Sequence, residues 1–465
     1  MTEELCFLTI TEAARRLRGG EFSPVALTEA FLERIEAINP KIDAYLLVTG
    51  DQALEAAQQA EKELSAGRDR GPLHGIPIAL KDNIETAGIR TTAHSRILLD
   101  HVPEADAAVV EKLQQSGAVI LGKLACLEFA HGAPSTNQAF PPARNPWDRD
   151  RGFTGGSSTG SGAAVAAGLA MAALGTDTGG SIRNPAALCG TAGLMPTYGR
   201  VSRRGVIPYS FSLDCCGPLA WTVKDCALVL GAIAGFDPAD PGSADLQVPD
   251  FTSQLEHGVA GLKIGVLRHF FEEDMVADPE MIASIDAALE VLGSQGAKVS
   301  DARAGPLADY HDVKTLVGEA EFFAAHEADW LARANDFGAS LQLRTAEGAL
   351  IGAVDYLHAQ RARRHLAAEM DQMFDSFDVL ITATVLDPAP PMPRDARGPK
   401  ARKPNLTQPF NVAGVPALSV CTGFNEAGLP LAMQIAARAF DETTLLRVGH
   451  TYERAAPYRD RRPEL

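Results

Sequence analysis

Two serines that each follow a pair of glycines are the residues of this sequence best suited to covalent chemistry. They lie in Gly155-Gly156-Ser157 and Gly179-Gly180-Ser181, on either side of an alanine-rich stretch. Glycines allow backbone conformations that are closed to other residues, and they leave N–H groups exposed. A serine at such a turn can attack a carbonyl carbon while nearby N–H groups stabilise the developing oxyanion. The pattern predicts a serine nucleophile beside an oxyanion hole.

Such a serine needs a base, and none of the eleven histidines lies in the segment 153–185 that holds both turns. Lys81 follows the apolar run Ile76-Pro77-Ile78-Ala79-Leu80, which predicts a short buried strand ending at this lysine. Burial lowers the pKa of a lysine because it disfavours the charged form. Holding that pKa at about 7–8 instead of ~10.4 costs on the order of 3–4 kcal/mol. Only a dedicated site would keep Lys81 as the base.

The elements that must position these residues alternate between helices and apolar strands. Helices are predicted at 11–19, 24–38, 51–67 and 105–115, and strands at 76–80, 118–121, 262–266, 379–383, 416–420 and 431–435. This alternation predicts an α/β protein with a mixed, mostly buried sheet covered by helices on both faces.

No segment of the sequence is typical of a domain linker, so we expect a single domain over residues 1–465. It would consist of an N-terminal helical segment (1–67), a core with the catalytic candidates (71–203) and the rest of the sheet with the substrate-pocket elements (204–465). The stretch 387–404, rich in Pro, Lys and Arg, is predicted to be an exposed loop beside the substrate entrance.

Composition excludes several classes of function. The net charge of −17 and the lack of a long basic run argue against nucleic-acid binding. The longest weakly polar stretch, 160–175, is too short and too rich in small residues to span a membrane, and no signal peptide is visible. Seven cysteines without CxxC spacing predict reduced, buried thiols. We therefore expect a cytoplasmic protein that binds neither nucleic acid nor membrane.

Several segments together resemble the amidase signature family, whose members use a Ser-Ser-Lys triad. They are 75–83 (GIPIALKDN), 145–147 (NPW), 155–158 (GGSS), 175–183 (GTDTGGSIR), 193–202 (GLMPTYGRVS) and 409–414 (PFNVAG). The interval of 24 residues between Ser157 and Ser181 is also the family's spacing. The resemblance covers nearly the whole chain and implies the amidase signature fold.

The resemblance also implies a role for each residue. Ser181 is the acyl-enzyme nucleophile, Ser157 lies on a cis peptide and relays a proton, and Lys81 is the base, neutral in the resting enzyme. The oxyanion hole consists of the backbone N–H groups of Thr178, Gly179, Gly180 and Ser181. Asp177 and Arg183 brace the nucleophile loop by pairing, and Ser158 supports it. No metal or cofactor is implied.

The expected substrate is a small-molecule amide, either an aryl or alkyl amide or an anilide, with carbamates and esters as further options. Phe129, Tyr209, Phe211 and the segment 322–356 are predicted to line an apolar pocket, and a homodimer stays open. Three positions depart from the family: Thr159 replaces a common glycine, Met195 a common lysine, and 124–127 the usual Thr-Asn-rich run. The last departure leaves the substrate in doubt.

Two alternatives stay open, and the sequence argues against two others. One is the glutaminase (A) subunit of a tRNA-dependent amidotransferase; such subunits usually carry an acidic residue shortly before the segment at 407–409, and 403–406 here has none. Another is a Ser-His-Asp esterase with Ser158 in a G-x-S-x-G elbow and Asp387 and His450 as partners, although 145–154 does not favour the required strand. A dinucleotide loop at 160–165 fails because position 165 is valine. His358 and His365 are better explained as a solvated helix face than as metal ligands.

Overall fold

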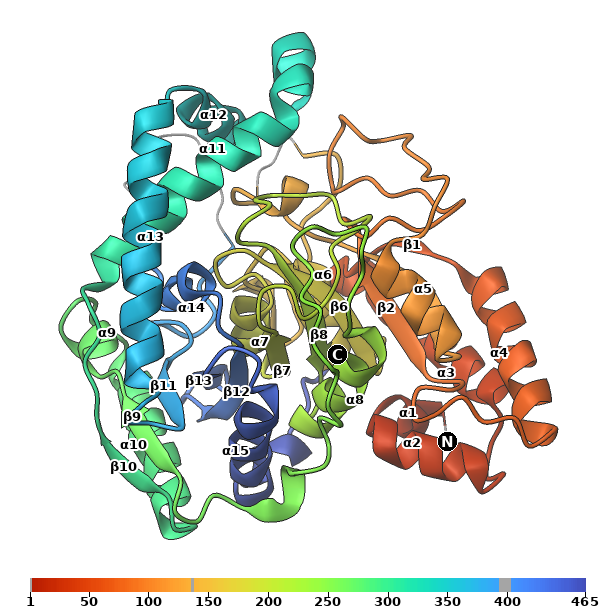
Figure 1. Ribbon diagram of the computed structural model, residues 1–465. Helices are drawn as coiled ribbons and strands as arrows, with labels where there is room; N and C mark the ends of the chain where they lie inside the picture. Colours follow the sequence, from red (N-terminus) through yellow and green to blue (C-terminus); the bar gives the residue numbers. More distant parts are fainter. Residues whose placement is uncertain (1, 135–137, 393–402) are drawn as a thin grey trace.

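A mixed sheet of eleven strands runs through the middle of the molecule (Figure 1). The computed structural model describes residues 2–134, 138–392 and 403–465. The strands are β1 (Tyr45–Val48), β2 (Pro77–Lys81), β3 (Val119–Leu124), β6 (Ala172–Asp177), β7 (Ala192–Met195), β8 (Cys215–Ala220), β9 (Lys263–Val266), β10 (Lys298–Asp301), β11 (Val379–Ala383), β12 (Ala417–Phe424) and β13 (Pro430–Ala437). Their order across the sheet is β1-β3-β2-β6-β8-β7-β12-β13-β11-β9-β10. A separate ribbon pairs β4 (Arg144–Asn145) with β5 (Asp148–Phe153).

Helices cover the sheet on both faces, as predicted. They are α1 (Thr2–Cys6), α2 (Ile10–Arg18), α3 (Pro24–Ile42), α4 (Gly50–Ser65), α5 (Ala108–Gln115), α6 (Thr159–Ala166), α7 (Arg183–Cys189), α8 (Val223–Ile233), α9 (His269–Glu272), α10 (Pro279–Ser294), α11 (Leu307–Arg333), α12 (Ala339–Ala349), α13 (Ala353–Met373), α14 (Gln408–Ala413) and α15 (Glu442–Ala455). The short 3₁₀ turns are η1 (Glu128–Ala130), η2 (Leu255–His257), η3 (Ala334–Asp336) and η4 (Pro457–Asp460).

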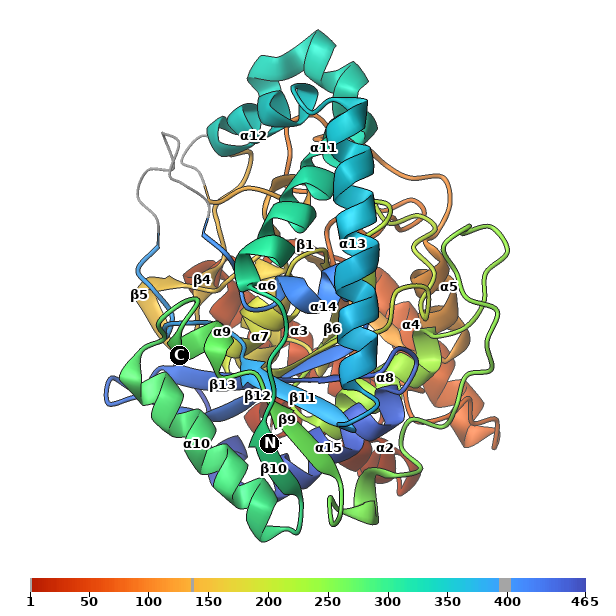
Figure 2. The ribbon, with the colours of Figure 1, turned by 60° about the vertical axis from the view of Figure 1, so that its left-hand side comes forward.

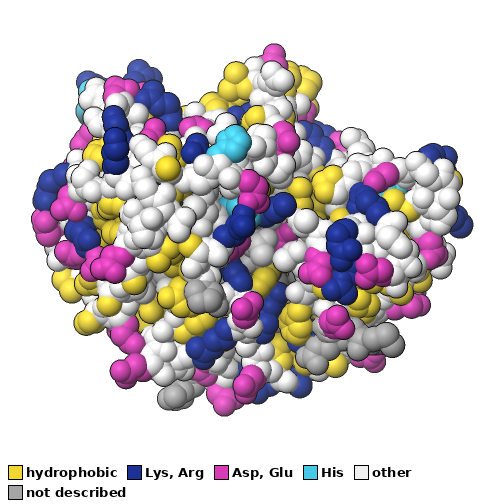
Figure 3. All heavy atoms as spheres, turned by 90° about the horizontal axis from the view of Figure 1, so that it is seen from below, with side chains coloured by type: hydrophobic (Ala, Val, Ile, Leu, Met, Phe, Trp, Pro, Cys, Tyr) yellow, Lys and Arg dark blue, Asp and Glu magenta, His cyan; other side chains and the backbone are white. Residues whose placement is uncertain are grey.

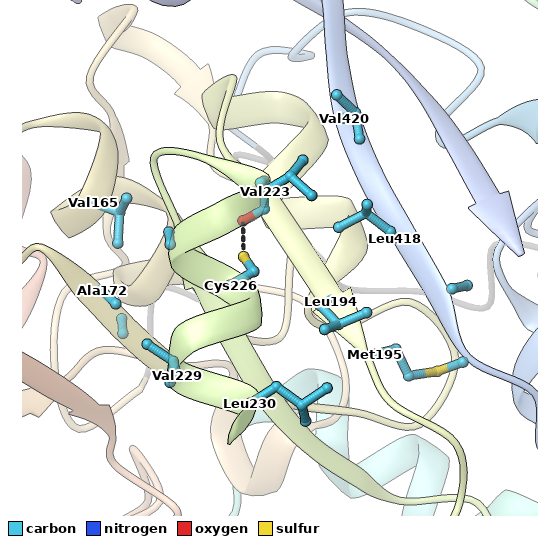
Figure 4. Close-up of a cluster of buried hydrophobic side chains, with 14 of the residues drawn as sticks. Val165, Ala172, Leu194, Met195, Val223, Cys226, Val229, Leu230, Leu418 and Val420 are labelled. Atoms are coloured by element: carbon cyan, nitrogen blue, oxygen red, sulfur yellow. Dashed lines mark hydrogen bonds between the residues drawn. The ribbon is translucent and has the colours of Figure 1, made fainter. Parts of the chain in front are cut away.

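Consecutive residues of the central strands point to opposite layers. The α-carbon of Gly193 on β7 faces Ala186 of α7, whereas the side chain of Leu194 packs with α8 (Figure 4). Helices α8, α10 and α15 cover the second face, and α6 and α7 cover the first. On the α7 side, the long helices α11 and α13 rise past α14 and carry α12 at their far end (Figure 2).

The helix boundaries differ from the prediction at two places near the N-terminus. Thr9, not Thr11, caps α2, and its side chain accepts a hydrogen bond from the Glu12 N–H at 3.2 Å. Ser23 and Pro24 begin α3 as predicted, but the helix continues through Pro40 to Ile42 and ends at Asp43 in the left-handed region. A proline in the last turn removes only one helical hydrogen bond, which the burial of Ile42 offsets.

Seven strands were not predicted: β1, β4, β5, β6, β7, β8 and β10. Strand β5 lies within 145–154, a segment whose composition was expected not to form a strand. Strands β6 and β8 consist mainly of small residues, so their local sequence carries no strand signal. Small residues let α6 lie close to the sheet: a Cβ on Gly175 would lie 2.7 Å from Ser158 Oγ. Helix α6 therefore packs unusually close to β6 beside the two serine turns.

The cysteine thiols lie in the core, in agreement with the prediction of buried thiols. All seven are free and buried. Cys226 of α8 packs beside Leu194, Val229 and Leu230, and its Sγ donates to the Ala192 carbonyl at 3.7 Å (Figure 4). Burial raises the pKa of the Cys226 thiol well above its usual value. Within the part of the chain that the structure describes, no helix combines the length and apolarity needed to cross a bilayer.

Candidate active site

Lys81 is the last residue of β2 and is fully buried. Strand β2 lies between β3 and β6, so neighbouring strands enclose the lysine on both sides. Its Nζ donates to Ser157 Oγ at 2.7 Å and to Thr176 Oγ1 at 2.7 Å. Burial lowers the pKa of the Lys81 ammonium to about 8, although nearby acidic groups such as Asp214 oppose the shift. The geometry thus joins Lys81 to one of the two candidate serines through a hydrogen bond.

Ser157 lies in the loop between β5 and α6, and the Gly156–Ser157 peptide bond is cis. The Ser157 carbonyl accepts a hydrogen bond from the Leu127 N–H at 2.9 Å. Gly156 leaves no room for a side chain, because a Cβ there would lie 2.6 Å from a Leu127 methyl carbon. The Ser158 N–H donates to the Ser181 carbonyl at 3.1 Å, so the two Gly-Gly-Ser turns are held together.

The loop after β6 carries Ser181, which is half-buried and lines the same cavity as Ser157. Gly180 has a φ of +120°, and a Cβ on it would lie 2.1 Å from Thr407 Oγ1. The Gly180 N–H donates to Asp177 Oδ1 at 2.7 Å. Among the residues that the structure describes, the N–H groups of Gly179 and Ser181 make no such bond. Of the four N–H groups assigned to the oxyanion hole, that of Gly180 is therefore already engaged.

Asp177 and Arg183 form a buried ion pair beneath this loop, with Nη2 and Oδ1 3.0 Å apart. Burial alone would raise the pKa of Asp177, but Arg183 and further hydrogen-bond donors lower it to about 2. Arg183 also donates to the Thr407 carbonyl at 2.9 Å, to Gln434 Oε1 at 2.9 Å and to Asn411 Oδ1 at 2.6 Å. These bonds fix the loop of Ser181 to α14 and β13.

A cavity of about 480 Å³ opens above the two serines, and its wall combines apolar side chains with four charged ones. Lys314 of α11, Arg344 of α12, Asp387 and Lys403 lie in the wall. The prediction of an apolar pocket therefore holds for much of the wall, which includes Leu127, Phe153 and Leu406, but of the three named aromatic residues only Tyr209 lines the cavity.

The other two aromatic residues lie elsewhere. Phe129 is buried behind the wall, in a cluster with Tyr209 and Phe322, and Phe211 is 50% exposed away from the cavity. Of the predicted loop 387–404, Asp387, Pro390, Lys403 and Pro404 line the cavity. Residues 393–402 of that loop lie outside the described residues.

Sequence reasoning missed Lys314 and His131 as cavity residues, whereas Arg344 belongs to the segment 322–356 that was predicted to line the pocket. Lys314 sits between Val313 and Val317 on the buried side of α11. An isolated lysine on the apolar face of a helix is the signal that could have found it. No comparable pattern marks His131, which lies in a loop.

The esterase alternative is not supported, because its three residues do not meet. Ser158 is fully buried, its Oγ hydrogen-bonds the Thr176 backbone at 3.3 Å, and it does not line the cavity. His450 belongs to α15, on the opposite face of the sheet, and its Nε2 lies 3.2 Å from Glu256 Oε1. Across residues 2–134, 138–392 and 403–465, no three His, Cys, Asp or Glu side chains are grouped to hold a metal ion.

The amidase family profile matches residues 26–446. The chain belongs to the amidase family. This confirms the resemblance drawn from the Gly-Gly-Ser turns and the lysine strand, and the structures below confirm the fold.

Known proteins similar to this amidase share its full length. The A subunit of the glutamyl-tRNA(Gln) amidotransferase of Chloroflexus aggregans is 44% identical, over 99% of each chain. An s-triazine catabolic enzyme, whose structure is described as a vestigial protein complex, matches with a TM-score of 0.91 and 34% identity, over 98% of this chain and 100% of the other. The A subunit of the Thermotoga maritima amidotransferase matches with a TM-score of 0.79 and 32% identity, over 98% of this chain and 95% of the other.

These relatives correct two predictions. The expected function, a stand-alone hydrolase of aryl or alkyl amides, is wrong, because the near full-length relatives are named as amidotransferase subunits. The exclusion of nucleic acid from the partners is also wrong, because that name includes a tRNA. Figure 3 shows acidic and basic side chains interspersed over one face. Composition reports only the charge of this chain, and other members of a complex can supply the contacts to a nucleic acid.

Proposed function

We propose that this amidase is the glutaminase (A) subunit of a tRNA-dependent amidotransferase, which hydrolyses glutamine and delivers the ammonia to a partner protein. The observation that carries the proposal is the 44% identity to the Chloroflexus aggregans protein over 99% of both chains. The s-triazine enzyme described as a complex adds support for a partner protein. The absence of an acidic residue at 403–406 counted against this function in the sequence.

The charged side chains of the cavity wall answer the objection that 403–406 contains no acidic residue. Glutamine is a zwitterion, so its site needs a cation for the α-carboxylate and an acceptor for the α-ammonium group. Arg344 and Lys403 are cations in the wall, and Asp387 is an acid in the same wall. Asp387 lies 16 positions before Lys403 and would supply the acidic group that 403–406 lacks.

The reaction starts with neutral Lys81, which accepts a proton from Ser157 while Ser157 accepts one from Ser181. Ser181 Oγ attacks the amide carbon, and the Gly179 and Ser181 N–H groups stabilise the oxyanion. As the C–N bond breaks, the proton returns through Ser157 to the leaving nitrogen, and ammonia departs. Water then attacks the acyl-enzyme by the same proton path and releases glutamate.

The test is affinity purification of the tagged chain from its own host, followed by two assays on the purified complex. We expect partner proteins to co-purify, glutamine to release ammonia, and glutamyl-tRNA(Gln) to become glutaminyl-tRNA(Gln). The Ser181→Ala complex should keep its partners but lose the glutamine-dependent reactions. A chain that purifies without partners and leaves glutamine intact would refute the proposed function.

A further inference from the structure

One buried carboxylate joins the oxyanion loop to a loop of the cavity wall. Asp214 lies just before β8 and is 6% exposed. Its Oδ1 accepts a hydrogen bond from Thr178 Oγ1 at 2.5 Å. Its Oδ2 accepts hydrogen bonds from the N–H groups of Tyr209 and Ser210, at 2.9 Å and 3.0 Å. Asp214 therefore connects two segments of the site that are far apart in the sequence.

Both connected segments belong to the place where the reaction occurs. Thr178 is the first residue of the loop whose N–H groups are assigned to the oxyanion hole, and Tyr209 lines the cavity. Burying a carboxylate is costly unless donors compensate for its lost hydration, and Asp214 has one hydroxyl and two N–H donors. Donors to an oxyanion act best when they are fixed before the reaction begins. The Asp214 carboxylate is placed to fix them.

Asp214 also acts on Lys81 through its charge. The other titratable groups that influence Lys81 are Asp177, Cys126 and Cys216. Asp177 is paired with Arg183, and burial raises the pKa of both thiols to about 12, so the thiols are neutral.

The charge of Asp214 is not balanced in the same way. Within the described residues Asp214 forms no ion pair, and the nearby Arg203 is paired with Asp240, at 2.8 Å between Nη2 and Oδ1. A carboxylate near an amine favours the ammonium form. Asp214 therefore raises the pKa of Lys81, against the larger effect of burial.

We propose that Asp214 is a positioning residue of the reaction, which aligns the oxyanion loop with the Tyr209 loop of the cavity wall. The inference rests on the proposed function only for the mechanism at Ser181 and Lys81, not for glutamine as the substrate. Loss of the carboxylate should slow the reaction of Ser181, because the loop loses its bond through Thr178. Loss of the charge alone should favour neutral Lys81, an effect that a merely structural role of Asp214 would not produce.

Three variants separate the hydrogen bonds from the charge. Asp214→Asn removes the charge but can keep all three bonds, because its Oδ1 accepts from the two N–H groups and its Nδ2 donates to the Thr178 hydroxyl. Asp214→Ala removes the charge and the bonds. Thr178→Val removes only the bond to the oxyanion loop. Glu290→Gln, at an exposed glutamate of α10, also removes one negative charge and is the matched control.

The test measures the rate at which a phosphonyl fluoride labels Ser181 between pH 6 and pH 10, on the full chain purified with any partners. Labelling needs the nucleophile, the oxyanion donors and the relay, but no amide substrate. Asp214→Ala and Thr178→Val should be labelled about 10- to 100-fold more slowly than the wild type at pH 9. Asp214→Asn should stay within about 3-fold of the wild type at pH 9, and its rate should rise at a lower pH. Glu290→Gln should match the wild type throughout.

Two results would overturn the inference: a wild-type labelling rate in Asp214→Ala or Thr178→Val, and an unchanged pH profile in Asp214→Asn. If thermal unfolding shows that Asp214→Ala does not fold, Asp214→Asn and Thr178→Val still decide. If labelling shows these dependences but the wild-type chain leaves glutamine intact, the role of Asp214 stands and the proposed function fails.

Discussion

Replacement of Lys81 tests the proposed proton path most directly. The pKa of Lys81 is about 8, so about a tenth of the enzyme holds a neutral lysine at pH 7 and about nine tenths at pH 9. The value of kcat/KM should therefore rise close to tenfold between these pH values and level off above them. The rise follows the neutral form, because only an unprotonated amine can accept the proton from Ser157.

Lys81→Met removes the proton acceptor with little change in volume, and Lys81→Arg replaces it by a guanidinium that stays protonated. Each variant should lose at least about 10⁴-fold in kcat/KM, which is ~5.5 kcal/mol of barrier, as expected when one member of a coupled catalytic unit is removed. The assay is ammonia release from glutamine and from glutaramate between pH 6 and pH 10. Thermal unfolding of each variant checks that it folds.

Lys123 offers a matched control, because it is also buried and burial also lowers its pKa to about 8. Its Nζ donates to Thr91 Oγ1 at 2.6 Å and lies 3.7 Å from Asp82 Oδ1. Lys123→Met should unfold at a lower temperature but keep the alkaline rise. A Lys81→Arg enzyme with near wild-type amide hydrolysis would refute the relay. If Lys123→Met lost the alkaline rise, the base would be Lys123 and not Lys81.

Three further changes test the loop of Ser181. Ser181→Ala should lose at least about 10⁴-fold in kcat and escape labelling by a phosphonyl fluoride, whereas Ser158→Ala should remain labelled and much more active. Gly180→Ala should lower activity and the melting temperature together, because a Cβ would lie 2.1 Å from a threonine hydroxyl oxygen. Arg183→Met should lower the free energy of unfolding, measured by chemical denaturation, by about 3–5 kcal/mol, because it leaves Asp177 charged and buried. An unchanged denaturation midpoint would contradict the role of Arg183 as the partner of Asp177.

The sequence predicted the parts of the site that depend on local pattern. The apolar run before Lys81 identified β2, and the paired glycines identified both serine turns. The strands β11, β12 and β13 were also predicted because they are continuous apolar runs. Such signals lie within a few residues of the feature that they predict.

What depended on distant partners could not be predicted. Arg344 and Asp387 lie in segments that were predicted to adjoin the pocket, but the local sequence of α11 does not mark Lys314 as a neighbour of Ser181. Strand β6 was missed because its small residues fit under α6, which is a tertiary constraint.

The bonds of Arg183 have a consequence for how the protein is made. Lys81, Ser157 and Ser181 leave the ribosome early, but Arg183 finds its partner Gln434 251 residues later in the chain. At 5–20 residues per second, roughly 10 to 50 s of translation separate the two. During that time the nascent chain holds the residues of the relay without the contacts that shape the loop of Ser181. Amide hydrolysis should therefore begin only after the C-terminal strands emerge, and ribosome-bound chains that stop before Gln434 should be inactive.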